Sequence, residues 1–221
     1  MTDSRTQILA RLRQHRTPFP DAPPPPERYL PVSVIDVTNE EALIARFTTE
    51  VDALKGTVTL CADVKAARKA MLTHIGTAER VMAWGEIPLT GWRQALSAKG
   101  ISVVIPDVRG EDRVPRYADL ESIAVGITGA AAAFATTGTI VLPTDAGQGR
   151  IPSLVPPTHI ALLPRERLFP RLEEWLTAEG RETLQRSRSV AFISGASKTG
   201  DIEMEIIYGV HGPKHVHIVL Y

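Results

Sequence analysis

Short apolar runs alternate with segments of helical periodicity between residues 39 and 106. Residues 39–55 place apolar side chains along one stripe of a helix, with Thr38 or Asn39 as its N-cap and Gly56 as its stop. Strands are predicted at 57–60, 81–84 and 101–106, and further helices at 65–74 and 92–98. This alternation predicts an α/β fold, a three-layer Rossmann-like sheet of mostly parallel strands with helices on both faces.

The pattern changes after about residue 122, where strand-like runs follow one another with tight turns between them. Strands are predicted at 123–128, 131–142 with a break at Thr137-Gly138, 159–163, 190–193 and 215–221, and a helical region interrupted at Gly180 is predicted at 168–186. The strands at 57–60 and 190–193 are expected to be buried. A smaller β-rich part is therefore expected beside the main sheet.

The N-terminal residues are predicted to form an extension. Residues 4–16 carry Ile8, Leu9 and Leu12 at helical spacing, and a run of prolines, most densely at 23–26, then excludes a helix. We divide the chain into a helix with a proline-rich linker at 1–31 and an α/β domain at 32–221. The prolines would also suit an SH3 domain, but a spacer is the favoured interpretation.

Charge and cysteine content exclude several classes of function. Lys+Arg and Asp+Glu both number 25 in 221 residues, so no overall field favours nucleic acid. The single cysteine, Cys61, is too few ligands for an iron–sulfur cluster or a structural zinc. The N-terminal residues lack a secretory apolar region, and no apolar run approaches the roughly 20 residues that span a bilayer. We therefore expect a cytoplasmic protein that does not enter a membrane.

Residues 193–203 form the first candidate site. A buried strand opens there into Gly195, Ser197, Lys198 and Thr199 before a predicted helical turn, an arrangement that presents backbone N–H groups to an anion. The glycines of a Walker A loop are missing. The alternative is a plain helix N-cap formed by Ser197 or Thr199. Asp201 and Glu203 then either interact favourably with the dipole at the helix N-terminus or act in catalysis.

Two further passages carry polar residues at predicted turns. In Gly209-Val210-His211-Gly212-Pro213 the glycines allow close approach, and His211 is our candidate for proton transfer, or else a histidine that hydrogen-bonds its loop. The other passage comprises Thr137, Gly138 and Thr139, followed along the chain by Arg150, Ser153 and His159. His215 and His217 point to one face of a predicted strand, but with no third ligand evident we predict no metal site.

Together these passages resemble the LUD domain of the lactate-utilization protein C family. The resemblance rests on Ala-x-Thr-Gly-Thr at 135–139, Ser-x-x-Pro-Pro-x-His at 153–159, Gly-x-Ser-x-Thr-x-Asp-Ile-Glu at 195–203 and Gly-Val-His-Gly-Pro at 209–213, and covers residues 120–221. It implies a fold like that of sugar isomerases and CoA transferases, and iron–sulfur partner subunits in a system that converts L-lactate to pyruvate. Where the family usually has glutamate in its Ala-Glu-Thr-Gly turn, this chain has Thr136. A carboxylate nucleophile is therefore missing, which counts against acyl or CoA transfer.

From the residues and the resemblance we expect a lactate-oxidation component without an iron–sulfur cluster that binds a small anion. The expected ligand-binding residues are Thr137, Gly138, Thr139, Arg150, Ser153, Gly195, Ser197, Lys198, Thr199, Gly209 and Gly212, and the expected catalytic residues are His211, Asp201 and Glu203. No cofactor follows from the sequence, and a homo-oligomer is compatible with it. The competing hypothesis is a stand-alone isomerase, transferase or folate cyclo-ligase-like enzyme on the same fold.

Overall fold

The computed structural model describes residues 3–14, 39–106, 113–145, 147–200 and 206–221. Contacts within the chain form two units, Met1–Val34 and Ile35–Tyr221. In the first unit, helix α1 (Ser4–Gln14) has no buried residue. The helix predicted at the N-terminus is thus confirmed over these residues, and the predicted proline-rich linker lies outside the described part of the chain.

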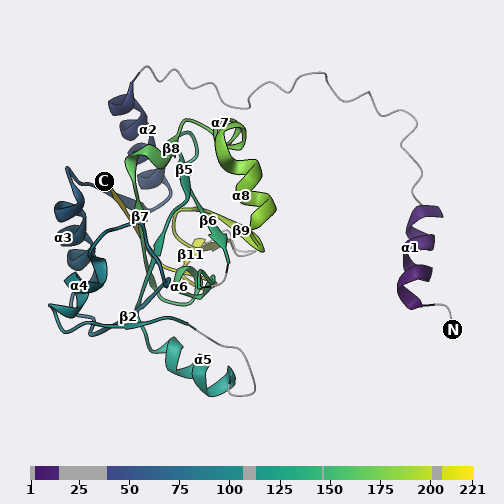
Figure 1. Ribbon diagram of the computed structural model, residues 1–221, viewed down its shortest axis with the longest axis horizontal. Coiled ribbons are helices and arrows are strands. Elements are labelled where there is room, and N and C mark those ends of the chain that lie inside the picture. The colour runs from purple at the N-terminus through teal and green to yellow at the C-terminus, as the bar shows by residue number, and fades with distance from the viewer. Residues whose placement is uncertain (1–2, 15–38, 107–112, 146, 201–205) are drawn as a thin grey trace. The chain divides into compact units, whose positions relative to one another are not determined.

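Among the described residues, a central sheet of six parallel strands runs through the second unit (Figure 1). The strand order is β1–β12–β7–β4–β2–β3. The strands are β1 (Gly56–Leu60), β2 (Arg80–Ala83), β3 (Ser102–Val104), β4 (Val125–Gly129), β7 (Thr158–Leu163) and β12 (His215–Leu220). All neighbouring pairs in this sheet are parallel, as the alternation of strands and helices predicts. The expectation that the strand at 57–60 is buried is wrong, because β1 is an edge strand and Leu60 is 53% exposed.

Helices cover both faces of this sheet, which confirms the predicted fold class. The helices of the second unit are α2 (Glu40–Ala53), α3 (Val64–Ile75), α4 (Trp92–Ser97), α5 (Arg113–Glu121), α6 (Ile151–Leu154), α7 (Leu172–Trp175) and α8 (Arg181–Arg186). Met71 of α3 and Leu96 of α4 pack with Ile127 on one face, and Phe47 of α2 packs with Ile218 on the other. No helix of the described residues is both long and apolar enough to cross a membrane.

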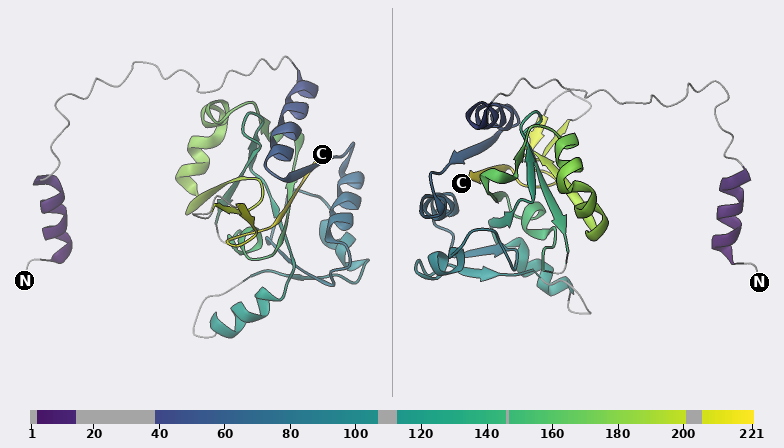
Figure 2. Two further views of the ribbon diagram at one scale, coloured as in Figure 1. Left: turned by 180° about the vertical axis from the view of Figure 1, so that it is seen from behind. Right: turned by 45° about the horizontal axis from the view of Figure 1, so that its top comes forward.

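A second, four-stranded sheet lies on the face that α2 covers, and it forms the smaller β-rich part (Figure 2). Its strands are β5 (Ala132–Phe134), β6 (Thr139–Thr144), β8 (Leu168–Phe169) and β9 (Ser189–Ser194), in the order β8–β5–β6–β9. Ile140 and Leu142 of β6 join the core that this sheet shares with the central sheet. After β9 the chain forms a separate antiparallel pair, β10 (Lys198–Gly200) and β11 (Ile206–Tyr208).

Local sequence signals explain where the first helices of the second unit begin. The side chain of Asn39 accepts a hydrogen bond from the Ala42 N–H at 2.8 Å, which confirms one of the two N-caps expected for α2. Asp63 accepts from the Ala66 N–H at 2.7 Å in the same way and begins α3. Each cap is a hydrogen bond between residues three positions apart, so it can be predicted from the local sequence.

The helix predicted at 168–186 differs from the structure at two points. Leu168 pairs with Ala133 as part of β8, so the first residues extend the second sheet. Gly180 does not interrupt the helix, because α7 continues through a π turn (Leu176–Gly180) directly into α8. A Cβ on Gly180 would lie 2.6 Å from Cε3 of Trp175, so glycine is required here for packing.

Two predictions about the segment around residue 195 are wrong. β9, expected to be buried, is an edge strand of the second sheet, and Phe192 is 47% exposed. The turn expected to begin a helix after Ser197 is strand β10, because Lys198 and Thr199 pair with Tyr208 and Ile207. That pairing joins residues about ten positions apart, which helical periodicity does not detect.

Candidate ligand-binding cleft

A cleft of about 770 Å³ lies near the amino ends of β7 and β12. Pro157 before β7 and the Gly209–Gly212 turn before β12 form part of its wall, and the segment from Gly147 to Val155 forms another part. The cleft is also lined by Pro106, by Tyr117 and Glu121 of α5, by Asp145, and by Arg188 before β9. The cleft therefore gathers segments that are separated by up to a hundred positions in the sequence.

The segment that carries Arg150 is held in place at three points. Backbone Gly85 donates to the carbonyl of Gly147 at 3.0 Å, and Trp84 Nε1 donates to the carbonyl of Gly149 at 2.8 Å. The helix that follows, α6, packs directly onto β4, since a Cβ on Gly126 would lie 1.7 Å from the Pro152 carbonyl oxygen. Arg150 therefore projects from a backbone fixed on both sides.

Hydrogen bonds to the segment after β9 fix the Gly209–Pro213 turn. The Gly209 N–H donates to the Ser197 carbonyl and the Ser197 N–H donates to the Pro213 carbonyl, both at 2.9 Å. Gly209 has φ of +82°, in the left-handed region that favours glycine. His211 is exposed at the centre of this turn and lines the cleft.

Charged groups of both signs line the cleft. Arg150 and Arg188 form no ion pair with another residue of the described part of the chain. Glu121 and Asp145 contribute two carboxylates. An occupant that presents both an anionic group and a hydrogen-bond donor would satisfy this set of side chains.

The structure brings only some of the predicted site residues together. Of these, Arg150, Gly209, His211 and Gly212 line the cleft. Ser153 lies in α6 and is 2% exposed, and its hydroxyl donates to the Arg150 carbonyl at 2.9 Å. Its observed contact thus stabilises the first turn of α6.

A second group of predicted residues lies at the opposite end of the β6–β9 pair. Thr139 begins β6, whereas Asp145 follows its last residue, so six residues, roughly 20 Å of strand, separate this group from the cleft. Thr139 Oγ1 contacts the Thr137 and Ser194 hydroxyls at 2.7 and 2.8 Å. These hydroxyl groups hydrogen-bond one another at the end of the strand pair.

Glycines let this end of the strand pair pack against the C-terminal end of α2. A Cβ on Gly138 would lie 2.8 Å from the Val51 nitrogen, and one on Gly195 would lie 2.3 Å from the Leu54 carbonyl oxygen. Both glycines also have positive φ, +56° and +77°. In the structure they serve close packing between backbones.

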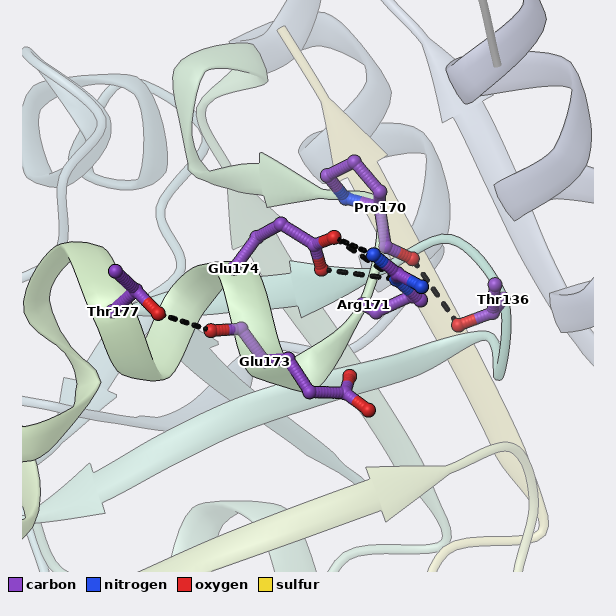
Figure 3. A network of polar contacts seen from close by, with 6 residues as sticks. All are labelled: Thr136, Pro170, Arg171, Glu173, Glu174 and Thr177. Carbon is purple, nitrogen blue, oxygen red and sulfur yellow. Dashed lines mark hydrogen bonds and ion pairs between the residues drawn. The ribbon is translucent and has the colours of Figure 1, made fainter. Parts of the chain in front are cut away.

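The Thr136 hydroxyl, at the position where glutamate is usual in the resembled family, donates to the Pro170 carbonyl at 3.1 Å (Figure 3). Arg171, which follows Pro170, forms an ion pair with Glu174 in the first turn of α7. The pair lowers the pKa of the Glu174 carboxyl, chiefly through the hydrogen bond from Arg171. The turn that contains Thr136 is thus hydrogen-bonded to the segment that leads into α7, and Thr136 does not line the cleft.

The remaining predicted residues follow β9. Ser197 Oγ lies 3.4 Å from the position of a Cβ on Gly212, next to the cleft turn, while Lys198 is exposed on β10 and Thr199 is half-buried. The two predicted acids, Asp201 and Glu203, lie outside the described residues. Their roles stay predictions.

The histidines on β7 and β12 have structural surroundings. His159 is fully buried, its Nε2 lies 2.8 Å from Thr128 Oγ1, and burial together with the nearby His217 lowers its pKa to about 3. His217 stacks on His74 at 4.2 Å between ring centroids. Among the described residues, no group of three or more histidine, cysteine or acidic side chains could hold a metal ion.

Sequence reasoning missed several residues of the cleft wall. Arg188 lies two positions before the strand predicted at 190–193, and Tyr117 and Glu121 lie on a helix that the periodicity does not indicate. The only available signal for Arg188 is a cation at the amino end of a strand. That signal is too common to select this residue.

Comparison with known proteins supports a family assignment. A family model described as the LUD domain matches residues 44–221. Lactate utilization protein C of an Exiguobacterium species is 46% identical over 101 residues, which cover 43% of each chain. The protein of the same name from Deinococcus radiodurans is 31% identical over 156 residues, covering 68% of this chain and 73% of that one.

Other similarities are more limited in coverage or in identity. Lactate utilization protein C of Oceanobacillus iheyensis is 37% identical over 103 residues, 45% of this chain and 44% of that one. The chain thus spans less than half the length of some curated relatives that it matches. The crystal structure of a DUF162 family protein from Deinococcus radiodurans superposes with a TM-score of 0.65 at 23% identity, over 83% of this chain and 99% of that one. That likeness shows the fold.

Proposed function

The chain belongs to the LUD domain family, and from that membership we propose that it is a component of a lactate-utilization system that binds a small carboxylate in the cleft. Relatives named lactate utilization protein C support involvement in lactate utilization. The observation that carries the proposed ligand is the placement of Arg150, Arg188 and the Gly209–Gly212 turn around one cleft.

The side chains of the cleft suit a 2-hydroxy acid. A guanidinium group binds a carboxylate through paired hydrogen bonds, which Arg150 or Arg188 would supply. Glu121 accepts hydrogen bonds and would suit the hydroxyl group, which a simple anion lacks. His211 is the residue that we propose accepts the proton of that hydroxyl group on oxidation to the 2-oxo acid.

The oxidation of lactate to pyruvate also breaks the C2–H bond, and we propose that this hydrogen leaves with two electrons as a hydride to an electron-accepting group, from which partner subunits receive the electrons. The chain has one cysteine, and its side chain is buried, so it does not supply the several thiolates that hold an iron–sulfur cluster. A volume of about 770 Å³ exceeds what a three-carbon acid fills, which leaves room for an electron-accepting group beside it. We place this role in the cytoplasm, as the sequence predicts.

Isothermal titration calorimetry with L-lactate and with pyruvate tests the anion site. We expect Arg150→Ala and Arg188→Ala each to weaken binding about tenfold or more, the worth of one charge-assisted hydrogen bond. Arg181→Ala is the matched control, because Arg181 is exposed on α8 and does not line the cleft. Affinity that is the same in wild type and both cleft variants would remove the proposal.

Turnover measurements separate the proposed component from a stand-alone enzyme. We expect the purified chain alone not to oxidise L-lactate, and activity to appear only with the cluster-bearing partner subunits. Turnover by the chain alone in an isomerase, transferase or folate cyclo-ligase assay would instead support a stand-alone enzyme. Lys198→Ala, titrated with L-lactate by calorimetry, tests the predicted role of Lys198 in anion binding and is expected to weaken it.

A further inference from the structure

A second cavity, of about 600 Å³, opens at the carboxyl ends of three parallel strands. Trp84 follows β2, Ala130 follows β4 and Pro164 follows β7, and all three residues line it. The cleft of the proposed function lies instead near the amino ends of β7 and β12. The two cavities are therefore distinct places in the fold.

This cavity lies at a topological switch point of the central sheet. Strands β2 and β4 are neighbours, yet the chain leaves β2 toward α4 on one face and leaves β4 toward β5 on the other. The two connections diverge and leave a crevice between them. In open α/β sheets such a crevice outside the carboxyl ends of the strands is where ligands bind.

Small residues keep the floor of the crevice open. Gly129, Ala130 and Ala131 follow one another at the end of β4, and all three line the cavity. A Cβ on Gly129 would lie 2.5 Å from Cδ of Pro88, so a larger residue would displace the connection after β2. Trp84 forms a fixed wall, because its Nε1 is held by the Gly149 carbonyl.

The polar part of the wall has unused acceptor capacity. Glu179, in the π turn, lines the cavity and forms an ion pair with Arg167 through one carboxylate oxygen, Oε2. Its other oxygen, Oε1, is buried and has no hydrogen-bond partner among the described residues. Arg186 is paired with Glu182, whereas Glu86 forms no ion pair within the described part of the chain.

We propose that this cavity is a binding site for a small organic cation with a flat or apolar body. Each arginine of the wall already has a carboxylate partner, and the acceptors left over are Oε1 of Glu179 and the carboxylate of Glu86, which accept but do not donate. A positively charged N–H donor would complete them. Trp84, Ile87 and Pro88 form the apolar part of the wall that would face the body of the ligand. Occurrence of the carboxylate in a π turn agrees with this role, since such turns are frequent at functional sites.

Nuclear magnetic resonance of the full chain tests the proposal with benzamidine as the probe. Of the three tryptophans, only Trp84 lines this cavity, so its indole N–H signal, assigned with Trp84→Phe, reports on the site. We expect benzamidine to shift this signal in a saturable way and the indole signals of Trp92 and Trp175 to stay unmoved. The neutral isostere benzamide is expected to bind at least about tenfold more weakly, because it lacks the charge.

Paired variants make the experiment specific. Glu179→Gln, which removes the charge at nearly constant shape, and Ala131→Leu, which fills the cavity at a half-buried position, are each expected to weaken benzamidine binding about tenfold. Glu173→Gln, at an exposed position of α7 outside the cavity wall, and Arg150→Ala in the cleft are expected to keep wild-type binding. Absence of binding to the wild type, equal binding of benzamide, or equal loss in Glu173→Gln would overturn the proposal.

Discussion

A Cβ added to Gly126 of β4 would lie 1.7 Å from the carbonyl oxygen of Pro152 in α6. Strand and helix thus meet backbone to backbone, at a separation that only glycine permits. Because Arg150 directly precedes α6, this contact also sets where that arginine stands in the cleft.

We expect Gly126→Ala to lower the free energy of unfolding by about 1–3 kcal/mol or more, since a backbone carbonyl has to give way. The same change moves α6 away from the sheet and is expected to weaken lactate binding through Arg150. Chemical denaturation and calorimetry measure the two effects. Gly149→Ala is the control, because its Cβ would meet nothing within 4 Å; equal stability of the two variants would contradict the argument.

Gly180→Ala is expected to destabilise the chain for a different reason. Gly180 has φ of −64°, which every residue adopts, so the cost comes only from the Trp175 ring 2.6 Å from the added Cβ. We expect a loss of about 1–3 kcal/mol in urea unfolding and a changed near-ultraviolet signal from Trp175. Gly200→Ala, whose added Cβ meets nothing within 4 Å, is expected to leave the free energy of unfolding unchanged. An unchanged free energy of unfolding in Gly180→Ala would show that the π turn relaxes to make room for the added Cβ.

Stability should fall as the pH drops below about 6.5. Burial, with the neighbouring His74 and His215, lowers the pKa of His217 to about 4, and burial lowers that of His159 to about 3. Both pKa values lie below the unfolded value of roughly 6.5. The neutral histidines therefore contribute stability that is complete above that value and is lost as the pH falls toward 4 and 3.

The slope of this loss is measurable. Near pH 5 each of these histidines binds one more proton in the unfolded state, which changes the free energy of unfolding by about 1.4 kcal/mol per pH unit. We expect His217→Gln to reduce the wild-type slope by about that amount in denaturation series from pH 4.5 to 6.5. An unchanged slope would show that burial does not hold the His217 ring neutral.

His211→Asn is expected to separate binding from chemistry in the cleft. Asparagine keeps a hydrogen-bonding side chain on the turn but does not accept a proton near neutral pH. We expect lactate affinity within about threefold of wild type, and turnover in the system reconstituted with its partner subunits lower by roughly 10²–10⁴. A loss of affinity with unchanged turnover would assign His211 to binding alone.

The sequence predicts the central sheet well because its signals are local. Asn39 caps α2 within three residues, and the strand predicted at 159–163 agrees with β7 to within one residue. The strand at Leu168 and the strand at Lys198 depend on partners about 10 to 35 positions away. Local periodicity therefore misassigned both segments as helical.

The candidate site could be predicted only in part, for a geometric reason. Thr139 and Arg150 are eleven positions apart in the sequence, but β6 carries the chain from one end of the second sheet to the other between them. The sequence assigns Thr139 and Arg150 to one group because they are close in the chain, although the fold separates them. Arg188, far along the chain, reaches the cleft because β9 runs antiparallel to β6 and begins where β6 ends.

Asp145 lines both the cleft and the second cavity, and the residues from 147 to 149 each line one of the two. The backbone from 147 to 149 therefore forms a partition between the cleft and the second cavity. Hydrogen bonds from Gly85 and Trp84 hold this partition against the end of β2. A compound that displaces this partition from one side changes the fit on the other. Thermodynamic reciprocity then requires that each occupant alter the affinity of the other by the same factor.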